Sequence, residues 1–157
     1  MNIDGSNLMS VVSTSSAEGN PKWSPDGQQI VFTHHQGYNN SELYKANIDG
    51  SDLTQLTFHG AYVGAPKWSP DGSQIAYSSD YSGNWEIYLM NADGSARVNI
   101  SNHGAKEGTP IWSPDGTQIA FISDRDGDYE IYVMNLDGSG VTQLTYNEAS
   151  DILGDWR

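Results

Sequence analysis

A run of alternating carboxylates is the strongest candidate for metal chemistry in this sequence. Asp124, Asp126, Asp128 and Glu130 flank Gly127 in one short stretch. Hard oxygen ligands on a tight turn suit Ca²⁺, although this stretch is shorter than the roughly 12-residue loop of an EF-hand. The same acids can instead cap their own turn by accepting backbone N–H groups. We expect turn capping, and a weak Ca²⁺ site at these four carboxylates is the alternative.

Four histidines offer nitrogen ligands in two arrangements. His34 and His35 are adjacent, whereas His59 and His103 each precede a glycine at matching positions of a repeat. Imidazole suits several transition metals, but no carboxylate neighbours His34 or His35 in the sequence. Transition-metal binding at His34 and His35 is thus only a weak alternative. At His59 and His103 we expect structural hydrogen bonds rather than a metal centre.

No catalytic signature is present in the sequence. It lacks a Gly-x-Ser-x-Gly elbow, a His-Glu-x-x-His motif, a phosphate-binding glycine loop and any cysteine. The acids Glu42, Glu86 and Glu130 recur at one position of each repeat, which favours a structural role over a catalytic one. The sequence predicts a protein that is not an enzyme, and an active site assembled from separate loops is the alternative.

The charge balance limits the classes of partner. The 157 residues include 20 acidic and 7 basic side chains, for a formal net charge of −13. Nucleic acids and anionic membrane surfaces are bound by Lys and Arg, so neither is expected as a partner. No apolar stretch approaches the roughly 20 residues of a membrane span, and the first residues do not resemble a signal peptide. Without cysteine there are no disulfides and no thiolate metal sites.

Two markers recur at near-constant spacing and identify the elements that position these side chains. Trp-Ser-Pro-Asp-Gly begins at Trp23, Trp68 and Trp112, and Trp156 stands where a fourth copy would begin, so the spacings are 45, 44 and 44 residues. Asp-Gly-Ser recurs in the same phase, beginning at Asp4, Asp49, Asp93 and Asp137. A period of this length indicates a repeat architecture.

Each period predicts four short strands joined by tight turns. The first strand ends at the tryptophan, and Ser-Pro-Asp-Gly then forms a type I turn that contains Asp26, Asp71 or Asp115. Asp-Gly between the third and fourth strands favours a type I′ hairpin. Four antiparallel strands per period of about 40–45 residues are typical of a propeller blade. The repeated tryptophans are then expected to pack between blades.

The predicted fold class is all-β: a β-propeller built of four-stranded antiparallel blades. Three complete blades are expected within residues 1–157, at about 19–58, 64–102 and 108–146. A stray fourth-type strand is expected at 6–13 and a stray first-type strand at 152–157.

The chain resembles the TolB-like β-propeller repeat, a Pro-Asp relative of the WD repeat. The resemblance rests on Trp-Ser-Pro-Asp-Gly, the turn 124–127, the strand 130–135 and Leu144-Thr145, which occur in this order. It implies a ring of about six blades and a periplasmic or extracellular location. Members of the family bind a lipoprotein through a propeller face, while similar blades occur in prolyl peptidases and oligogalacturonide lyases. The fold therefore does not decide the activity.

The loops that vary between copies follow the second and fourth strands, so strand alternation places them on one face. Variable loops on a rigid scaffold are where recognition usually occurs. We expect a non-catalytic scaffold that binds a protein or peptide through this face. The alternatives are a propeller that binds a carbohydrate or a cation, and an accessory segment of a hydrolase or lyase. The expected contact residues are His34, His35, Tyr38, Tyr62, Tyr81, Trp85, Lys106, Arg125 and Tyr129.

Three blades and two stray strands do not close a ring. Open blade faces expose apolar surface and unpaired edges, which favour association. Two chains together would supply the usual number of blades, so we expect a homodimer under two-fold symmetry, with strand exchange or displacement at its two seams. The alternatives are a larger ring in which the leading and trailing strands form partial blades, and an open fragment that associates further.

Overall fold

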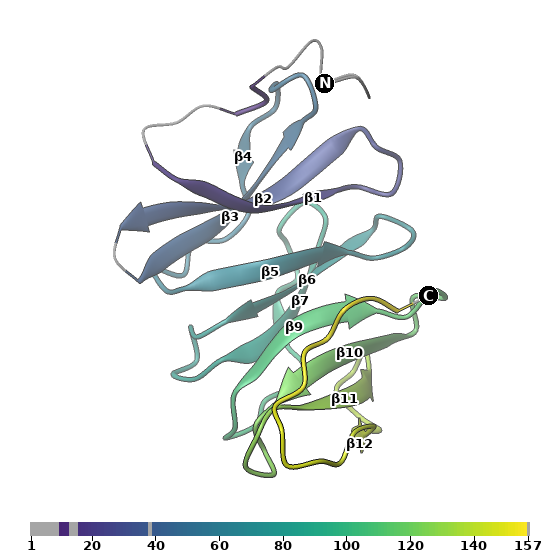
Figure 1. Cartoon of the computed structure of the whole chain (residues 1–157). Coiled ribbons are helices and arrows are strands. Elements are labelled where there is room, and N and C mark those ends of the chain that lie inside the picture. The colour runs from purple at the N-terminus through teal and green to yellow at the C-terminus, as the bar shows by residue number, and fades with distance from the viewer. Residues whose placement is uncertain (1–9, 13–15, 38, 157) are drawn as a thin grey trace.

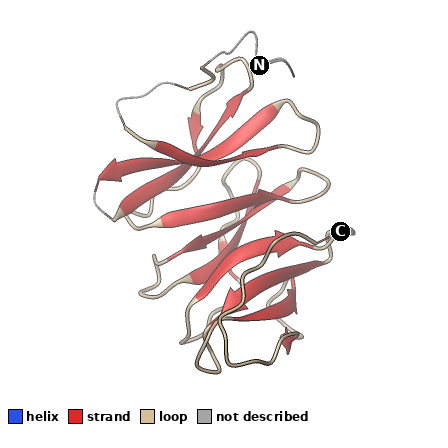
Figure 2. Ribbon diagram, in the orientation of Figure 1, coloured by secondary structure: helices blue, strands red, loops and turns tan. Residues whose placement is uncertain are grey.

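The computed structural model describes residues 10–12, 16–37 and 39–156. These residues form twelve β-strands and no helix (Figures 1 and 2). Accordingly, this part of the chain contains no helix that is long and apolar enough to span a membrane. The predicted all-β fold class is confirmed.

The strands form three four-stranded antiparallel sheets, each in chain order, which are the blades (Figure 1). The first blade contains β1 (Glu18–Trp23), β2 (Gln29–Gly37), β3 (Asn40–Asn47) and β4 (Thr54–Gln55). The second contains β5 (Val63–Trp68), β6 (Gln74–Ser79), β7 (Glu86–Asn91) and β8 (Val98–Asn99). The third contains β9 (Glu107–Trp112), β10 (Gln118–Ser123), β11 (Glu130–Asn135) and β12 (Thr142–Gln143).

The Ser-Pro-Asp-Gly turns form as the sequence predicts. Gly27 N–H donates to Ser24 C=O over 2.9 Å, the bond of a type I turn. The Asp26 carboxylate accepts from Ser24 Oγ (2.5 Å) and from Gln28 N–H (3.0 Å). Asp71 and Asp115 accept from the equivalent serines. These repeated acids therefore stabilise the turns between first and second strands.

The Asp-Gly turns differ from the predicted type I′ hairpin. Within the first of them only Gly50 has a positive φ, +85°, whereas type I′ requires positive φ at both central residues. Gly50 N–H donates to Asn47 C=O (2.9 Å), and Asn47 N–H donates to Ser51 C=O (2.9 Å). The geometry is a type I turn followed by a glycine bulge. The Asp49 carboxylate stabilises it by accepting from Ser51 N–H (2.9 Å).

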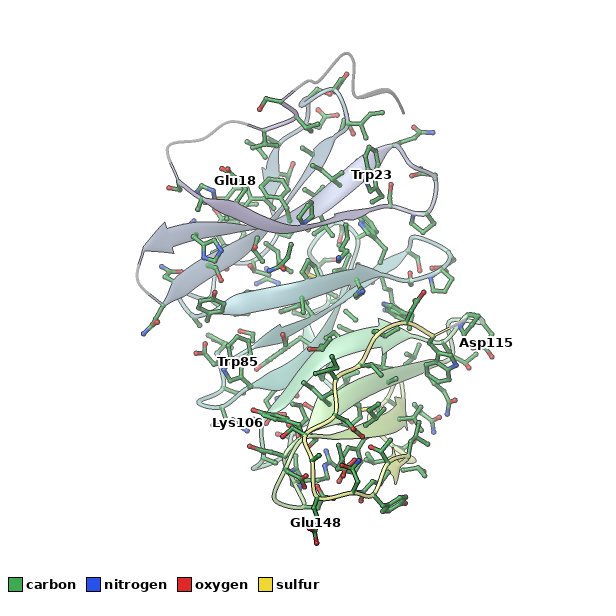
Figure 3. The ribbon with its side chains drawn as sticks, in the orientation of Figure 1. Glu18, Trp23, Trp85, Lys106, Asp115 and Glu148 are labelled. Atoms are coloured by element: carbon green, nitrogen blue, oxygen red, sulfur yellow. The ribbon has the colours of Figure 1, made fainter. Side chains whose placement is uncertain are left out.

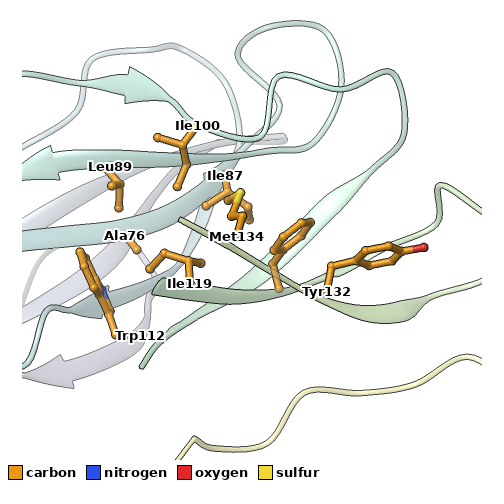
Figure 4. Packing of buried hydrophobic residues seen from close by; sticks show 9 residues of the cluster. Ala76, Ile87, Leu89, Ile100, Trp112, Ile119, Tyr132 and Met134 are labelled. Atoms are coloured by element: carbon orange, nitrogen blue, oxygen red, sulfur yellow. The ribbon is translucent and has the colours of Figure 1, made fainter. Parts of the chain in front are cut away.

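The hydrophobic cores lie between blades rather than within one sheet. The core between the first and second blades comprises Val31, Leu43, Leu56, Val63, Ile75, Tyr77, Tyr88 and Met90. The core between the second and third comprises Ala76, Ile87, Leu89, Ile100, Trp112, Ile119, Phe121, Tyr132 and Met134 (Figure 4). Neighbouring residues of β6 contribute to opposite cores, because side chains alternate across a strand. Each blade is thus buried on the faces where it meets a neighbour.

The repeated tryptophans join each first strand to the blade before it. Trp68 Nε1–H donates to Lys22 C=O (3.2 Å), and Trp112 Nε1–H donates to Lys67 C=O (3.0 Å). Trp112 is only 6% exposed, whereas Trp23 is 61% exposed. The difference arises because no earlier first strand lies beside Trp23 among the described residues.

The segment 10–12 packs on the first blade as the fourth strand of a preceding blade would. A Cβ placed on Gly50 would lie 2.5 Å from Val11 O, and one on Gly94 would lie 2.9 Å from Leu56 O. Val11 and Leu56 hold the same repeat position, so the two contacts are equivalent. No strand is assigned to 10–12, and residues 6–9 and 13 of the predicted strand 6–13 lie outside the described residues.

The segment 151–156 follows the third blade in the same manner. Asp151 N–H donates to Tyr129 C=O (2.6 Å), as Glu107 N–H donates to Trp85 C=O (2.8 Å). The strand predicted at 152–157 is not formed over residues 152–156. The physical reason is that no second strand able to pair with it is present among the described residues.

Candidate partner-binding face

The variable connections and the Ser-Pro-Asp-Gly turns lie at opposite ends of the blades. Figure 3 shows Glu18, Trp85 and Lys106 on one side of the blades, and Trp23 and Asp115 on the other. This separation follows from the antiparallel order of the strands, because β1 starts at Glu18 and ends at Trp23. The predicted contact residues can therefore be located on one side.

An aromatic row crosses from the first blade to the second on this side. The ring centroids of His35 and Tyr62 are 5.9 Å apart, and those of Tyr62 and Trp85 are 5.5 Å apart, both edge-to-face. All three side chains are half-buried. Edge-to-face packing holds aromatic rings in defined orientations, so this row is ordered before any partner binds.

A pocket continues the row from the second blade to the third. It encloses about 220 Å³, and Trp85, Lys106 and Tyr129 form part of its lining. Lys106 is exposed, while Tyr129 is half-buried. Five of the nine predicted contact residues thus lie in one band across three blades. We call His35, Tyr62, Trp85, Lys106 and Tyr129 the aromatic band.

Three other predicted contact residues lie apart from the aromatic band. His34 packs edge-to-face on Tyr44 with centroids 5.0 Å apart, and its Nδ1 lies 3.5 Å from the Glu18 carboxylate. Tyr81 is 57% exposed and packs against His59, with centroids 4.3 Å apart. Arg125 contacts Glu107. Tyr38 lies outside the described residues.

Arg125 folds back onto its own blade, the third, rather than pointing into solvent. Its side chain is 17% exposed, and Nη2 donates to Glu107 Oε1 over 3.1 Å. The guanidinium also lies over the Tyr132 ring, 4.6 Å from its centroid. That Arg125 contacts a partner stays a prediction; in the structure its guanidinium is held by Glu107 of the same blade.

Glu107 is a buried acid that sequence reasoning did not single out. It is 1% exposed, and Oε1 accepts from Ser123 Oγ (3.0 Å) as well as from Arg125. Its Oε2 accepts no hydrogen bond, and the neighbouring Glu86 carboxyl is the acceptor for its proton when Glu107 is protonated. Burial and, after it, the neighbouring Glu86 carboxyl together raise the pKa of this carboxyl to about 7, against the opposing effect of Ser123 and Arg125. The sequence offered little signal, because the same repeat position holds Glu18 in the first blade and Val63 in the second.

The repeated acids of the third strands fasten blade edges. Glu42 accepts from Thr57 Oγ1 (2.5 Å) and from Gly60 N–H (2.7 Å). Glu86 accepts from Ser101 Oγ (2.5 Å) and His103 N–H (3.1 Å). Glu130 accepts from Thr145 Oγ1 and from Asn147 N–H (2.8 Å). Closely similar contacts in three blades agree with the structural role expected of these acids.

Three of the four predicted cation ligands converge. One carboxylate oxygen from each of Asp126, Asp128 and Glu130 lies within 4.8 Å of the others. Asp124 does not join them, because its Oδ1 accepts from Lys106 N–H (2.7 Å). Asp126 accepts from Gln143 Nε2, and both Glu130 oxygens have donors. Asp128 Oδ2 has none, so turn and blade contacts already use most of the oxygens.

The histidines make the structural contacts expected of them. His59 Nε2 lies 3.3 Å from Tyr77 Oη, and burial lowers the His59 pKa. His103 Nδ1 accepts from Ala105 N–H (3.1 Å) and lies 3.6 Å from Glu107 Oε1. Among the described residues the only three-residue grouping of His, Asp and Glu side chains with metal-ligand spacing is the acidic one above.

Comparisons with known proteins agree with this architecture. A family model described as TolB beta propeller domain matches residues 1–157. The protein assigned as TolB in Agrobacterium tumefaciens is 27% identical, with a TM-score of 0.73, over 83% of this chain and 50% of that one. TolB from Acinetobacter baumannii is 26% identical, with a TM-score of 0.77, over 94% of this chain and 37% of that one.

A peptidase shares the fold at lower identity. The puromycin-hydrolyzing peptidase of Mycobacterium tuberculosis is 18% identical, with a TM-score of 0.74, over 91% of this chain and 24% of that one. This likeness concerns the fold alone. The chain spans half or less of the length of each of these solved structures. The comparison with curated proteins found no match.

Proposed function

The chain belongs to the TolB β-propeller domain family, and on that premise we propose that it is a non-catalytic scaffold that binds a protein or peptide partner through the aromatic band. Two solved TolB structures are 26–27% identical to this chain. Propellers are also found within enzymes such as the peptidase above. Family membership therefore supports only the scaffold, and the proposal that it binds a partner rests on the aromatic band.

The observation that carries the proposal is the continuity of the aromatic band across three blades. Tyr and Trp are the side chains most often found as interface anchors. Here His35, Tyr62 and Trp85 orient one another, and Trp85 and Tyr129 line one pocket. Ordered anchors lose little conformational entropy on binding, which favours affinity.

A peptide-display selection against the chain tests this proposal. Selected peptides should lose at least about tenfold in affinity with Trp85→Ala or Tyr62→Ala, which corresponds to at least about 1.4 kcal/mol. Leu53→Ala is the matched control, since Leu53 is also a solvent-exposed hydrophobe, 47% exposed, beside the Asp-Gly turns at the other end of the blades. Peptides that respond to Leu53→Ala and ignore both aromatic substitutions would refute the proposal.

The acidic grouping Asp126, Asp128 and Glu130 supports a second candidate, a weak Ca²⁺ site. Oxygen ligands on a turn suit this ion, and the unpartnered Asp128 Oδ2 is the observation in its favour. The donors already present on Asp126 and Glu130 weigh against it. Binding of a carbohydrate, or a role as an accessory segment of a hydrolase or lyase, has no comparable support among the described contacts.

We also propose that chains of this sequence pair through their open blade faces. The first blade presents a pocket of about 220 Å³ lined by Val11, Val12, Pro21, Ile30 and Phe32, together with Glu18 and Gly19. Pairing requires strand exchange or displacement at 10–12 and 151–156, which occupy the seam positions. Light scattering should give twice the chain mass of 17.1 kDa, and a monomer that melts cooperatively would exclude the homodimer. Family membership supports a periplasmic or extracellular location.

A further inference from the structure

A pocket of a different character lies at the opposite end of the blades from the aromatic band. The first strands β1, β5 and β9 end there beside one another. The pocket is open and encloses about 320 Å³. Four of the chain's five tryptophans line it: Trp23, Trp68, Trp112 and Trp156. Its walls are therefore mainly indole rings and the prolines of the repeated turns.

The residue before each tryptophan sets the charge of this pocket. These residues are Lys22, Lys67, Ile111 and Asp155, and all four line it. Burial lowers the pKa of Lys67, and the Lys22 ammonium lowers it further, while Asp155 acts in the opposite direction. The two cations are thus close enough to repel each other. An anion between them would relieve this repulsion.

Asp26, Asp71 and Asp115 of the repeated turns do not line the pocket, and the charges that act on Lys67 are those of Lys22 and Asp155. Asp26, Asp71 and Asp115 each accept hydrogen bonds from a serine and from backbone amides of their own turn. Asp155 does line the pocket, and its Oδ1 accepts from Trp156 N–H (3.0 Å). Two ammonium groups then face one carboxylate, so the pocket is locally cationic in a chain of net charge −13.

We propose that this pocket binds a small organic anion, with Lys22 and Lys67 holding its carboxylate or phosphate group and the tryptophans enclosing its apolar part. The volume suits one small molecule. Lysine ammoniums are compact point charges that accept either kind of anionic group. The indole N–H groups of Trp68 and Trp112 already donate to main-chain carbonyls, so these rings serve as walls and not as donors.

The test is a titration of ¹⁵N-labelled protein at constant ionic strength, following the five tryptophan indole N–H signals. The probes are phenylacetate and phenyl phosphate, which share a ring and differ in the anionic group, with benzyl alcohol as the uncharged control. We expect saturable shifts at Trp68 and Trp112 with at least one of the two anions, and none with benzyl alcohol. Trp85, which lies outside this pocket, is the internal reference.

Charge substitutions separate this site from general anion effects. Lys67→Met keeps the apolar stem and should weaken the binding at least about tenfold, as expected for loss of a hydrogen bond to a charged group. Lys67→Arg should retain it and shows that the position tolerates substitution. Lys45→Met removes an equal charge at a lysine outside the pocket and should bind as the parent does. The proposal is overturned if neither anion gives a saturable shift, or if Lys67→Met and Lys45→Met bind equally.

Discussion

The buried Glu107 carboxyl should make the stability of the chain fall as pH rises from 5 to 8. Its pKa is raised from 4.5 to about 7, first by burial and then by the neighbouring Glu86. The folded state therefore retains a proton that the unfolded chain has already released. Because the folded state binds more protons in this interval, the free energy of unfolding decreases with pH.

The size of the effect follows from the two pKa values. A shift from 4.5 to about 7 corresponds to roughly 3 kcal/mol in total, of which about 2 kcal/mol is lost between pH 5 and pH 8. Glu107→Gln removes this titration. The amide oxygen can still accept from Ser123 and Arg125, and the amide N–H can donate toward Glu86 in place of the carboxyl proton.

Urea denaturation at pH 5 and pH 8 measures the difference. The wild-type chain should lose about 2 kcal/mol more than Glu107→Gln over this interval. Glu148→Gln is the matched control, because Glu148 is exposed and the substitution removes the same charge; it should behave as wild type. Subtracting the loss of one variant from that of the other cancels the contribution of groups that titrate in both, such as His59. Parallel losses in wild type and Glu107→Gln would refute the reasoning.

Other substitutions test the blade construction and the Ca²⁺ alternative. Gly138→Ala should lower the free energy of unfolding by more than about 2 kcal/mol, because φ is +81° and a Cβ would collide with Ile100 O. Gly83→Ala, with φ of +107° but open space around it, should lose only about 1 kcal/mol in the same denaturation assay. Ile119→Ala should cost about 2–5 kcal/mol, since Ile119 is fully buried between blades; a loss below that of Gly83→Ala would contradict the inter-blade core. Millimolar Ca²⁺ should leave the melting temperature unchanged, and an increase that Asp126→Ala removes would establish the cation site instead.

The repeat made the strands predictable, but it could not predict which copies of a residue are buried. Leu56, Ile100 and Leu144 hold one position of the repeat, and the first two are 1% and 6% exposed. Leu144 is 53% exposed. Burial at this position depends on the blade that follows, so identical residues in identical local structure differ in environment.

The candidate face was predictable in part for the same reason. Loop variability located Tyr62, Trp85 and Lys106 correctly on one side, because strand alternation fixes the side of every connection. It could not show that Arg125 turns inward, since its partner Glu107 lies in a different element. Pairing between side chains of separate elements depends on distances that the sequence alone does not supply.

Positions at which the residue differs between repeats are not explained by the packing of the blades alone. Glu42, Glu86 and Glu130 make equivalent contacts in three blades, so their burial is part of the blade itself. Glu107 stands where the first blade has the more exposed Glu18 and the second has Val63, and the residues before the tryptophans change from lysine to Ile111 and Asp155. A stacked repeat needs the same packing at each seam, so a residue that changes between copies is not required by packing. The burial of Glu107 and the charge of the pocket therefore depend on residues that differ between copies, and these can be altered without changing the repeated contacts that hold the blades together.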